Sequence, residues 1–280
     1  MQEKYLVIPN KKDLSIFLEH GLNNFILPLK DYSCGFDIYY SIEEINEISL
    51  KHKTYVIMNK LIHKSVNSFK EIYEKFNKNI MFIVEDIGLT SIIDKERLVL
   101  FENHIESNYK AINFLSEIGI NNVVINNDLT INEIKEIRSK TKSKLYYFLI
   151  NRNTLLYSKR KLVTNYNTHY NIDSDSKKYN LKEEVSHHPL MIREEEDSTV
   201  INNFKLFSAN KYIDELLDID YLIINTSTMS DLELKVTLEH YRDKELINIL
   251  DTDYYFLEND IKYKVGDIKW NMNYCYQQEI

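Results

Sequence analysis

KLYYFLI, residues 144–150, is apolar and aromatic almost without a break. An apolar run without polar alternation is typical of a strand that is buried on both faces of a parallel sheet. Seven shorter runs of the same kind are spread along the chain, at Tyr5–Ile8, Phe25–Leu29, Tyr55–Met58, Met81–Val84, Leu98–Phe101, Val123–Ile125 and Tyr221–Ile224. The sequence therefore predicts eight buried strands.

Amphipathic segments separate most of these strands and predict helices. Ser41 and Thr130 each stand three residues before a glutamate, which is the spacing of a capping box at a helix start. Strands that alternate with helices pair in parallel through right-handed crossovers, and closing the sheet leaves no exposed edge. We predict a single α/β domain over residues 1–250, a (β/α)8 barrel of the TIM type.

Two segments break the alternation and predict additions to the barrel. Residues 165–187 are rich in Asn, Ser, Lys and Tyr, which indicates a long polar loop, and residues 189–205 follow it as a β-hairpin. Residues 251–280 form a C-terminal extension, with a second hairpin over Asp253–Asp267.

Composition excludes several classes of protein. Five glycines in 280 residues argue against a glycine-rich phosphate loop. A net charge of −8 does not by itself suggest a nucleic-acid protein, although local basic patches can still bind RNA, and we expect no DNA partner. Cys34 and Cys275 have neither disulfide nor metal-ligand spacing. The N-terminus does not resemble a signal peptide, and no run approaches the roughly 20 apolar residues of a membrane span. We expect a cytoplasmic protein that has no membrane partner.

A polar segment follows the KLYYFLI run and is the first candidate site. It reads LLYSKRKLVTNY, residues 155–166, and places Tyr157, Ser158, Lys159, Arg160 and Lys161 at a predicted strand end. In barrels of this type, loops after the strands converge on the ligand. A guanidinium such as that of Arg160 is suited to bidentate recognition of phosphate or carboxylate. The alternative is a solvated basic turn.

This turn and the later segment HPLMIREEEDSTVINN, residues 188–203, resemble the bacterial collagenase-like peptidase family U32. Shorter matches follow other predicted strands, at Met58–His63, Glu85–Gly88, Asn108–Asn113 and Asn127–Thr130. The resemblance covers most of residues 4–245 in the same order, and it also implies a barrel.

The resemblance implies an iron–sulfur cluster in several members, held by four cysteines. Only Cys34 is near one of those positions here, and Lys161 stands where a cysteine is common. One thiolate cannot hold a cluster, so we expect no cofactor and no metal site in this chain.

The chain also departs from the family after two predicted strands. Asn151-Arg152 replaces a His-Gly pair, which removes a possible acid–base group, and Ile223-Ile224-Asn225-Thr226 replaces Lys-Ile-(Glu/Asp)-Gly, which removes a cation and an anion. The remaining rim candidates for acid–base chemistry are His63, His104, Glu85 and Asp86, whereas Asn59 joins Tyr157, Ser158, Lys159 and Arg160 as a candidate for substrate binding. The sequence leaves open whether the chain is a complete enzyme.

Three functions remain open. The resemblance implies either a collagenase-like protease of unassigned mechanism or a part in hydroxylation of the wobble uridine of transfer RNA. Short members with few cysteines look like partners of longer, cysteine-bearing paralogues, so our leading hypothesis is an accessory subunit in 5-hydroxyuridine formation that contacts transfer RNA and such a paralogue. The third function is a non-catalytic protein-binding scaffold.

Overall fold

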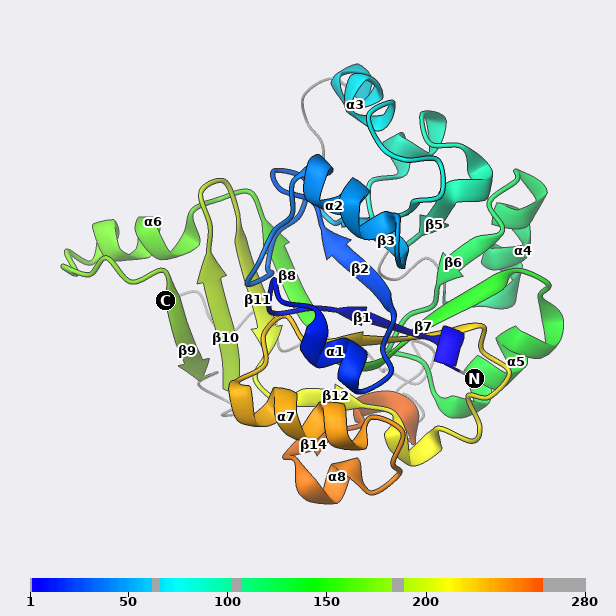
Figure 1. Cartoon of the computed structure of the whole chain (residues 1–280). Coiled ribbons are helices and arrows are strands. Elements are labelled where there is room, and N and C mark those ends of the chain that lie inside the picture. The colour runs from blue at the N-terminus through cyan, green and yellow to red at the C-terminus, as the bar shows by residue number, and fades with distance from the viewer. Residues whose placement is uncertain (1, 62–65, 102–106, 183–188, 259–280) are drawn as a thin grey trace, which may run out of the picture.

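Eight parallel strands close into a barrel (Figure 1), as predicted. The computed structural model describes residues 2–61, 66–101, 107–182 and 189–258. The barrel strands, in their order around the sheet, are β13 (Tyr221–Asn225), β1 (Tyr5–Ile8), β2 (Asn24–Pro28), β3 (Lys53–Met58), β4 (Met81–Val84), β5 (Leu98–Leu100), β6 (Asn122–Val124) and β7 (Lys144–Asn151). β7 then pairs in parallel with β13, which closes the ring.

β7 shows why the KLYYFLI run has no polar alternation. Tyr146 and Phe148 belong to the apolar cluster that fills the barrel, whereas Tyr147 and Leu149 belong to the larger cluster outside it. Both faces of the strand are therefore shielded from water. Burying a side chain of this size contributes roughly 1.5–3 kcal/mol, so each residue of the run favours this placement.

Helices cover the outside of the barrel, and their N-termini are fixed by local sequence. They are α1 (Ser15–Glu19), α2 (Ile42–Ser49), α3 (Val66–Tyr73), α4 (Tyr109–Glu117), α5 (Ile131–Lys140), α7 (Asp231–His240) and α8 (Leu246–Ile249). The predicted capping boxes are confirmed at the starts of α2 and α5. A third begins α7, where Ser230 is capped reciprocally by Glu233. Short 3-10 turns, η2 (Ile87–Ser91) and η3 (Lys95–Arg97), connect β4 to β5. In the part of the chain that the structure describes, no helix is long and apolar enough to cross a membrane.

A second, antiparallel sheet is inserted between β7 and β13. Its order is β8 (Thr154–Ser158), β11 (Thr199–Asn203), β10 (Pro189–Glu194) and β9 (Lys178–Lys182). β10 and β11 form the hairpin expected at residues 189–205. With α6 (Leu162–His169), this sheet projects to the left of the barrel in Figure 1.

The insertion is more ordered than the sequence predicted. The polar turn predicted for residues 155–166 is the strand β8 followed by the start of α6, and the polar loop predicted for residues 165–187 contains the rest of α6 and the strand β9. The reason is that β9 is exposed along nearly all of its length. A strand that faces water carries no apolar pattern, so its pairing with β10 cannot be seen in the sequence.

The chain returns to the barrel through β12 (Leu206–Ser208), which pairs with β7 and with β14 (Thr252–Asp253). After β14 comes the 3-10 turn η5 (Tyr255–Leu257), where Tyr255 stacks on Phe207 with ring centroids 6.1 Å apart. Most of the C-terminal hairpin predicted over Asp253–Asp267 lies outside the described residues. In the described part, β14 pairs with β12.

Candidate functional site

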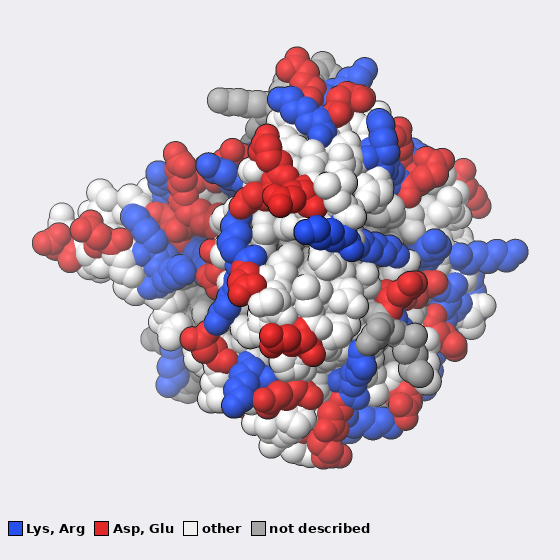
Figure 2. Space-filling view, in the orientation of Figure 1, with Lys and Arg blue, Asp and Glu red and all other residues white. Residues whose placement is uncertain are grey.

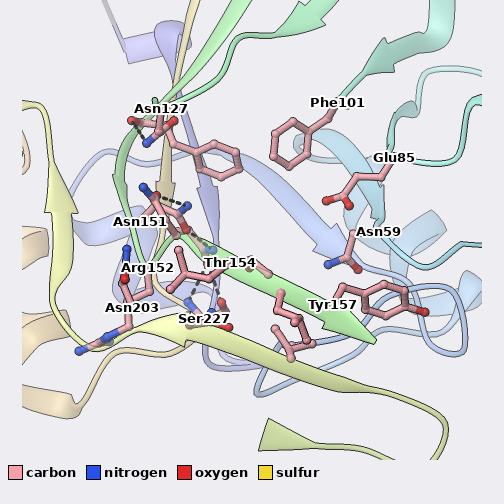
Figure 3. A pocket seen from close by; sticks show the side chains of 18 of the residues that line it. Asn59, Glu85, Phe101, Asn127, Asn151, Arg152, Thr154, Tyr157, Asn203 and Ser227 are labelled. Carbon is pink, nitrogen blue, oxygen red and sulfur yellow. Dashed lines mark hydrogen bonds between the residues drawn. The ribbon is translucent and has the colours of Figure 1, made fainter. Parts of the chain in front are cut away.

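A cavity of about 360 Å³ lies at the carboxyl ends of the barrel strands, under the inserted sheet. Glu85, Asn59 and Tyr157 lie on one side of it in Figure 3, and Asn127, Asn151 and Arg152 on the other. Asparagine is the most frequent residue of its lining, with carboxamides from Asn59, Asn126, Asn127, Asn151, Asn153, Asn202, Asn203 and Asn225. Barrel enzymes place their ligands at this end.

Aromatic rings supply the apolar part of the lining. Phe101 and Phe148 are tilted against each other with centroids 5.4 Å apart, and Tyr157 and Phe256 also line the cavity. Phe256 is 45% exposed, which is unusual for so large an apolar side chain. A cavity with aromatic faces and carboxamide edges is suited to a flat, polar ring.

Four of the polar side chains form a hydrogen-bonded chain whose direction is fixed. The backbone N–H of Ser227 donates to Oδ1 of Asn225 over 3.1 Å, and the Ser227 hydroxyl donates to the same oxygen over 2.6 Å. Nδ2 of Asn225 therefore donates to Oδ1 of Asn151 at 2.8 Å, and Nδ2 of Asn151 donates to Oδ1 of Asn153 at 3.2 Å. Because a backbone N–H can only donate, it sets the orientation of all three carboxamides. We call these four residues the amide chain.

The amide chain ends at Asn153, whose side chain carries a donor that is unpaired among the described residues. Asn153 uses its side-chain oxygen to accept from Asn151, and its amide nitrogen has no partner in the part of the chain that the structure describes. Asn153 lines the cavity. The site therefore offers N–H groups that a ligand carbonyl can accept.

Asn59 and Cys34 belong to the opposite wall. Oδ1 of Asn59 accepts the Cys34 backbone N–H at 2.8 Å, and Nδ2 of Asn59 donates to the Cys34 carbonyl at 3.0 Å. Asn59 thus fixes the loop that carries Cys34. The thiol is 2% exposed, and burial raises its pKa to about 12. A protonated thiol is a poor nucleophile and a poor metal ligand.

Arg152 explains one departure from the family pattern. Its side chain is buried, and it donates to the carbonyl oxygens of Phe204 at 2.8 Å and Thr228 at 2.7 Å. It also forms an ion pair with Glu233, the residue that caps α7. The guanidinium joins the start of the inserted sheet to the loop after β13, so it braces the cavity wall.

The inserted sheet is fastened to the barrel loops by charge. Oε1 of Glu195, in the β10–β11 turn, accepts from the backbone N–H of Gly35 at 2.8 Å and from the Tyr39 hydroxyl at 2.7 Å. Lys60 and Asp197 form an ion pair at 2.9 Å. These contacts hold the hairpin over the cavity.

The structure brings together three of the residues predicted from sequence. Asn59, Glu85 and Tyr157 all line the cavity. Asp86 instead caps the turn η2, where its carboxylate accepts the Gly88 N–H at 2.9 Å. His63 and His104 lie outside the described residues.

The other predicted binding residues lie at the outer end of β8. Ser158 is half-buried, Lys159 and Arg160 are exposed, and these three are absent from the described lining of the cavity. β8 leads the chain outward along the inserted sheet, and its described contribution to the cavity lining ends at Tyr157. Lys159 and Arg160 are therefore exposed beside the cavity and do not belong to its described lining.

Charge elsewhere is mixed. In the face shown in Figure 2, acidic and basic side chains are interspersed over most of the surface, and a row of basic side chains crosses its middle. Among the described residues, there is no group of three or more His, Cys, Asp or Glu side chains that could hold a metal ion.

The sequence analysis missed most of the carboxamides. Asn126-Asn127 follows β6, and Asn151 and Asn153 lie at and just after the end of β7. Asn225 ends β13. The signal in the sequence is the repetition of asparagines at the carboxyl ends of three barrel strands.

Comparison with known proteins points to one family. Residues 10–259 match the model of peptidase family U32. The solved structure of the U32 peptidase Mk0906 superposes with a TM-score of 0.51 at 11% identity, covering 81% of this chain and 93% of that one. That likeness shows the fold.

A second solved structure, the Bacillus cereus spore cortex-lytic enzyme SleL, matches with a TM-score of 0.36 at 12% identity over 91% of this chain and 74% of that one, which is too low to carry an argument. No curated protein matches the chain.

Proposed function

The chain belongs to peptidase family U32, and we propose that it is an accessory member that binds a uracil ring in the carboxyl-end cavity and acts in hydroxylation of the wobble uridine of transfer RNA. The observation that carries this proposal is the fixed direction of the amide chain. Its open end at Asn153 offers N–H donors, and uracil has two carbonyl acceptors.

The rest of the lining supports the same ligand. Proteins recognise unstacked RNA bases by stacking them on aromatic rings and bonding their edges. Phe101 and Phe148 supply rings, and the carboxamides supply edges that both donate and accept. Pockets of about 300–1,000 Å³ are usual for small ligands, and a cavity of about 360 Å³ is at the lower end of that range.

An accessory role is supported by two uncharged side chains at the rim. Asn151 and Asn225 occupy positions where the resembled family carries a histidine and an acidic residue, and here they bond to each other. Cys34, the thiol in the lining, is held protonated by burial, which raises its pKa to about 12. Glu85 and Asp128 are the carboxylates in the described lining. These groups are sufficient for binding a ligand, whereas peptide hydrolysis needs an activated nucleophile or an activated water molecule.

We propose a longer, cysteine-bearing paralogue as the partner that supplies the redox chemistry. The chain has two cysteines, and an iron–sulfur cluster needs about four thiolates. The net charge of −8 is consistent with a division of labour in which the partner supplies much of the electrostatic affinity for RNA.

The test is mass-spectrometric analysis of transfer-RNA nucleosides from cells with and without this chain. We expect hydroxylated wobble uridine to fall when the chain is removed, in a strain that has no other route to that nucleoside. Restoring the natural chain or an Asn165→Ala variant should restore the nucleoside, because Asn165 is exposed on α6. An Asn153→Ala variant should not, because it removes the open donor.

An unchanged nucleoside profile after removal of the chain would sink the proposal. Cleavage of a peptide substrate by the purified protein, lost on substitution of Glu85, would instead support the protease reading. Partner binding that ignores every residue of the cavity would support the scaffold.

A further inference from the structure

A second cavity, of about 440 Å³, lies at the opposite end of the barrel. It is formed where β3, β4, β6, β7 and β13 begin, as shown by Lys53, Met81, Asn122, Lys144 and Tyr221 in its lining. In barrels of this type, the amino-terminal face ordinarily serves stability and the ligand binds at the other end. A cavity here that is as large as the one at the carboxyl end is therefore not explained by the proposed function.

Four lysines line this amino-terminal cavity, namely Lys53, Lys95, Lys142 and Lys144. Across the described ranges, none of the four forms an ion pair, although ten other lysines do, namely Lys11, Lys12, Lys60, Lys78, Lys140, Lys177, Lys178, Lys205, Lys211 and Lys244. Glu96 is the one carboxylate in the described lining. Asp220, which directly precedes β13 at the same end of the barrel, forms an ion pair with Arg138 at 2.9 Å. The cavity thus concentrates uncompensated positive charge in a chain whose net charge is −8.

Tyrosine hydroxyls form the floor of the cavity. Tyr55 and Tyr146 lie inside the barrel with their hydroxyl oxygens 3.4 Å apart, and Tyr146 stacks on Tyr221 with centroids 4.5 Å apart. Nζ of Lys53 donates to the Tyr221 hydroxyl at 2.7 Å and lies 4.4 Å from the centre of that ring. Burial raises the pKa of Tyr55 and Tyr146, so both stay protonated and can donate.

Cations around the rim of a concave site and hydroxyl donors at its floor are complementary to a small, multiply charged oxyanion. A cavity with walls of low dielectric also strengthens the field of its charges compared with the same lysines on an open surface. Ammonium groups bind phosphate as point charges with three rotatable donors, so they need no fixed fork geometry.

We propose that the amino-terminal cavity is a binding site for a phosphate-bearing small molecule, with Lys53, Lys142 and Lys144 around the phosphate and the tyrosine floor beneath it. The size of the cavity leaves room for a group larger than phosphate itself. The site is separated from the uracil cavity by the packed barrel interior, so it is independent of the proposed function.

The probe is pyrophosphate, titrated calorimetrically into the full-length protein at low ionic strength. We expect saturable binding that weakens as salt is added. A Lys142→Gln, Lys144→Gln double variant should weaken binding by at least about tenfold, which corresponds to roughly 1.4 kcal/mol. Both lysines are exposed, and in the described structure their side chains make no hydrogen bond, so this variant should fold normally.

The matched control is Lys110→Gln, which removes an exposed lysine from α4 and should leave binding unchanged. A Lys53→Gln variant tests the floor, since it also removes the contact with Tyr221. The proposal is overturned if pyrophosphate does not bind saturably. It is also overturned if Lys110→Gln weakens binding as much as the double variant, because the attraction would then be a property of the whole surface.

Discussion

Replacement of Arg152 by alanine should destabilise the protein strongly. The guanidinium is 6% exposed, and its loss leaves the carbonyl oxygens of Phe204 and Thr228 without that donor and Glu233 without its cation. Breaking a buried ion pair costs about 3–5 kcal/mol, and the 24% exposure of the Glu233 side chain reduces this because water can solvate the carboxylate. We therefore expect a loss of about 3 kcal/mol.

Urea unfolding followed by circular dichroism measures this loss. With a denaturant slope of about 3 kcal/mol per molar, the midpoint should fall by about 1 M. Arg160→Ala is the matched control, because Arg160 is an exposed arginine nearby in the same insertion and its loss should leave the midpoint unchanged. Arg152→Lys should lie between the two, since it keeps the charge and loses the fork. Equal midpoints for Arg152→Ala and Arg160→Ala would refute the view that Arg152 braces the cavity wall.

Three further predictions concern the cavity and the inserted sheet. Asn225→Asp keeps the acceptor for Ser227 but removes the donor to Asn151, so the amide chain loses its fixed direction. Uridine binding, measured calorimetrically, should therefore weaken by about tenfold. Unchanged uridine binding would contradict the role of the amide chain. In a Cys275→Ser background, Cys34 should resist iodoacetamide until the protein is unfolded. A pKa of about 12, against an ordinary 9.0, leaves roughly a thousandfold less of the reactive thiolate. Rapid alkylation of the folded protein would count against the burial of Cys34. Glu194 is buried, and burial acts to raise its pKa, but hydrogen bonds from Thr164 and Lys177 lower the pKa below 4.5. The stabilisation by the ionised Glu194 should therefore be complete above pH 4.5 and be lost as pH falls through the lowered pKa. Glu194→Gln should therefore flatten the loss of stability that urea melts record as pH falls below 4.5, whereas a variant at the exposed Glu196 should keep the natural slope.

The barrel could be predicted from the sequence because burial on two faces leaves a strong pattern. β7 is apolar between its two ends, and the capping boxes at Ser41 and Thr130 are local signals that tertiary structure did not override. The inserted sheet could not be predicted in full. β9 is exposed and carries no apolar pattern, and β8 is followed by two lysines and an arginine that suggest a polar turn. The pairing of these two strands with β10 and β11 is therefore set by tertiary structure alone.

The candidate site was predicted only in part for a similar reason. Strand ends located Asn59 and Glu85, because each directly follows the apolar run of a barrel strand, whereas Tyr157 lines the cavity from β8 of the inserted sheet. The bonds that give the site its chemistry join residues far apart in sequence, such as Asn225 and Asn151. Nor does the sequence show that β8 leads Arg160 away from the cavity.

The account is tested most directly by the binding of short RNA stem-loops that differ in one unpaired base. We predict that the purified protein binds a stem-loop with uridine at that position more tightly than one with cytidine, since cytidine replaces a carbonyl acceptor by an amino donor that meets the open N–H of Asn153. The preference should disappear in Asn153→Ala and persist in Asn165→Ala. Equal affinity for the two bases, or a preference that survives loss of Asn153, would contradict the account.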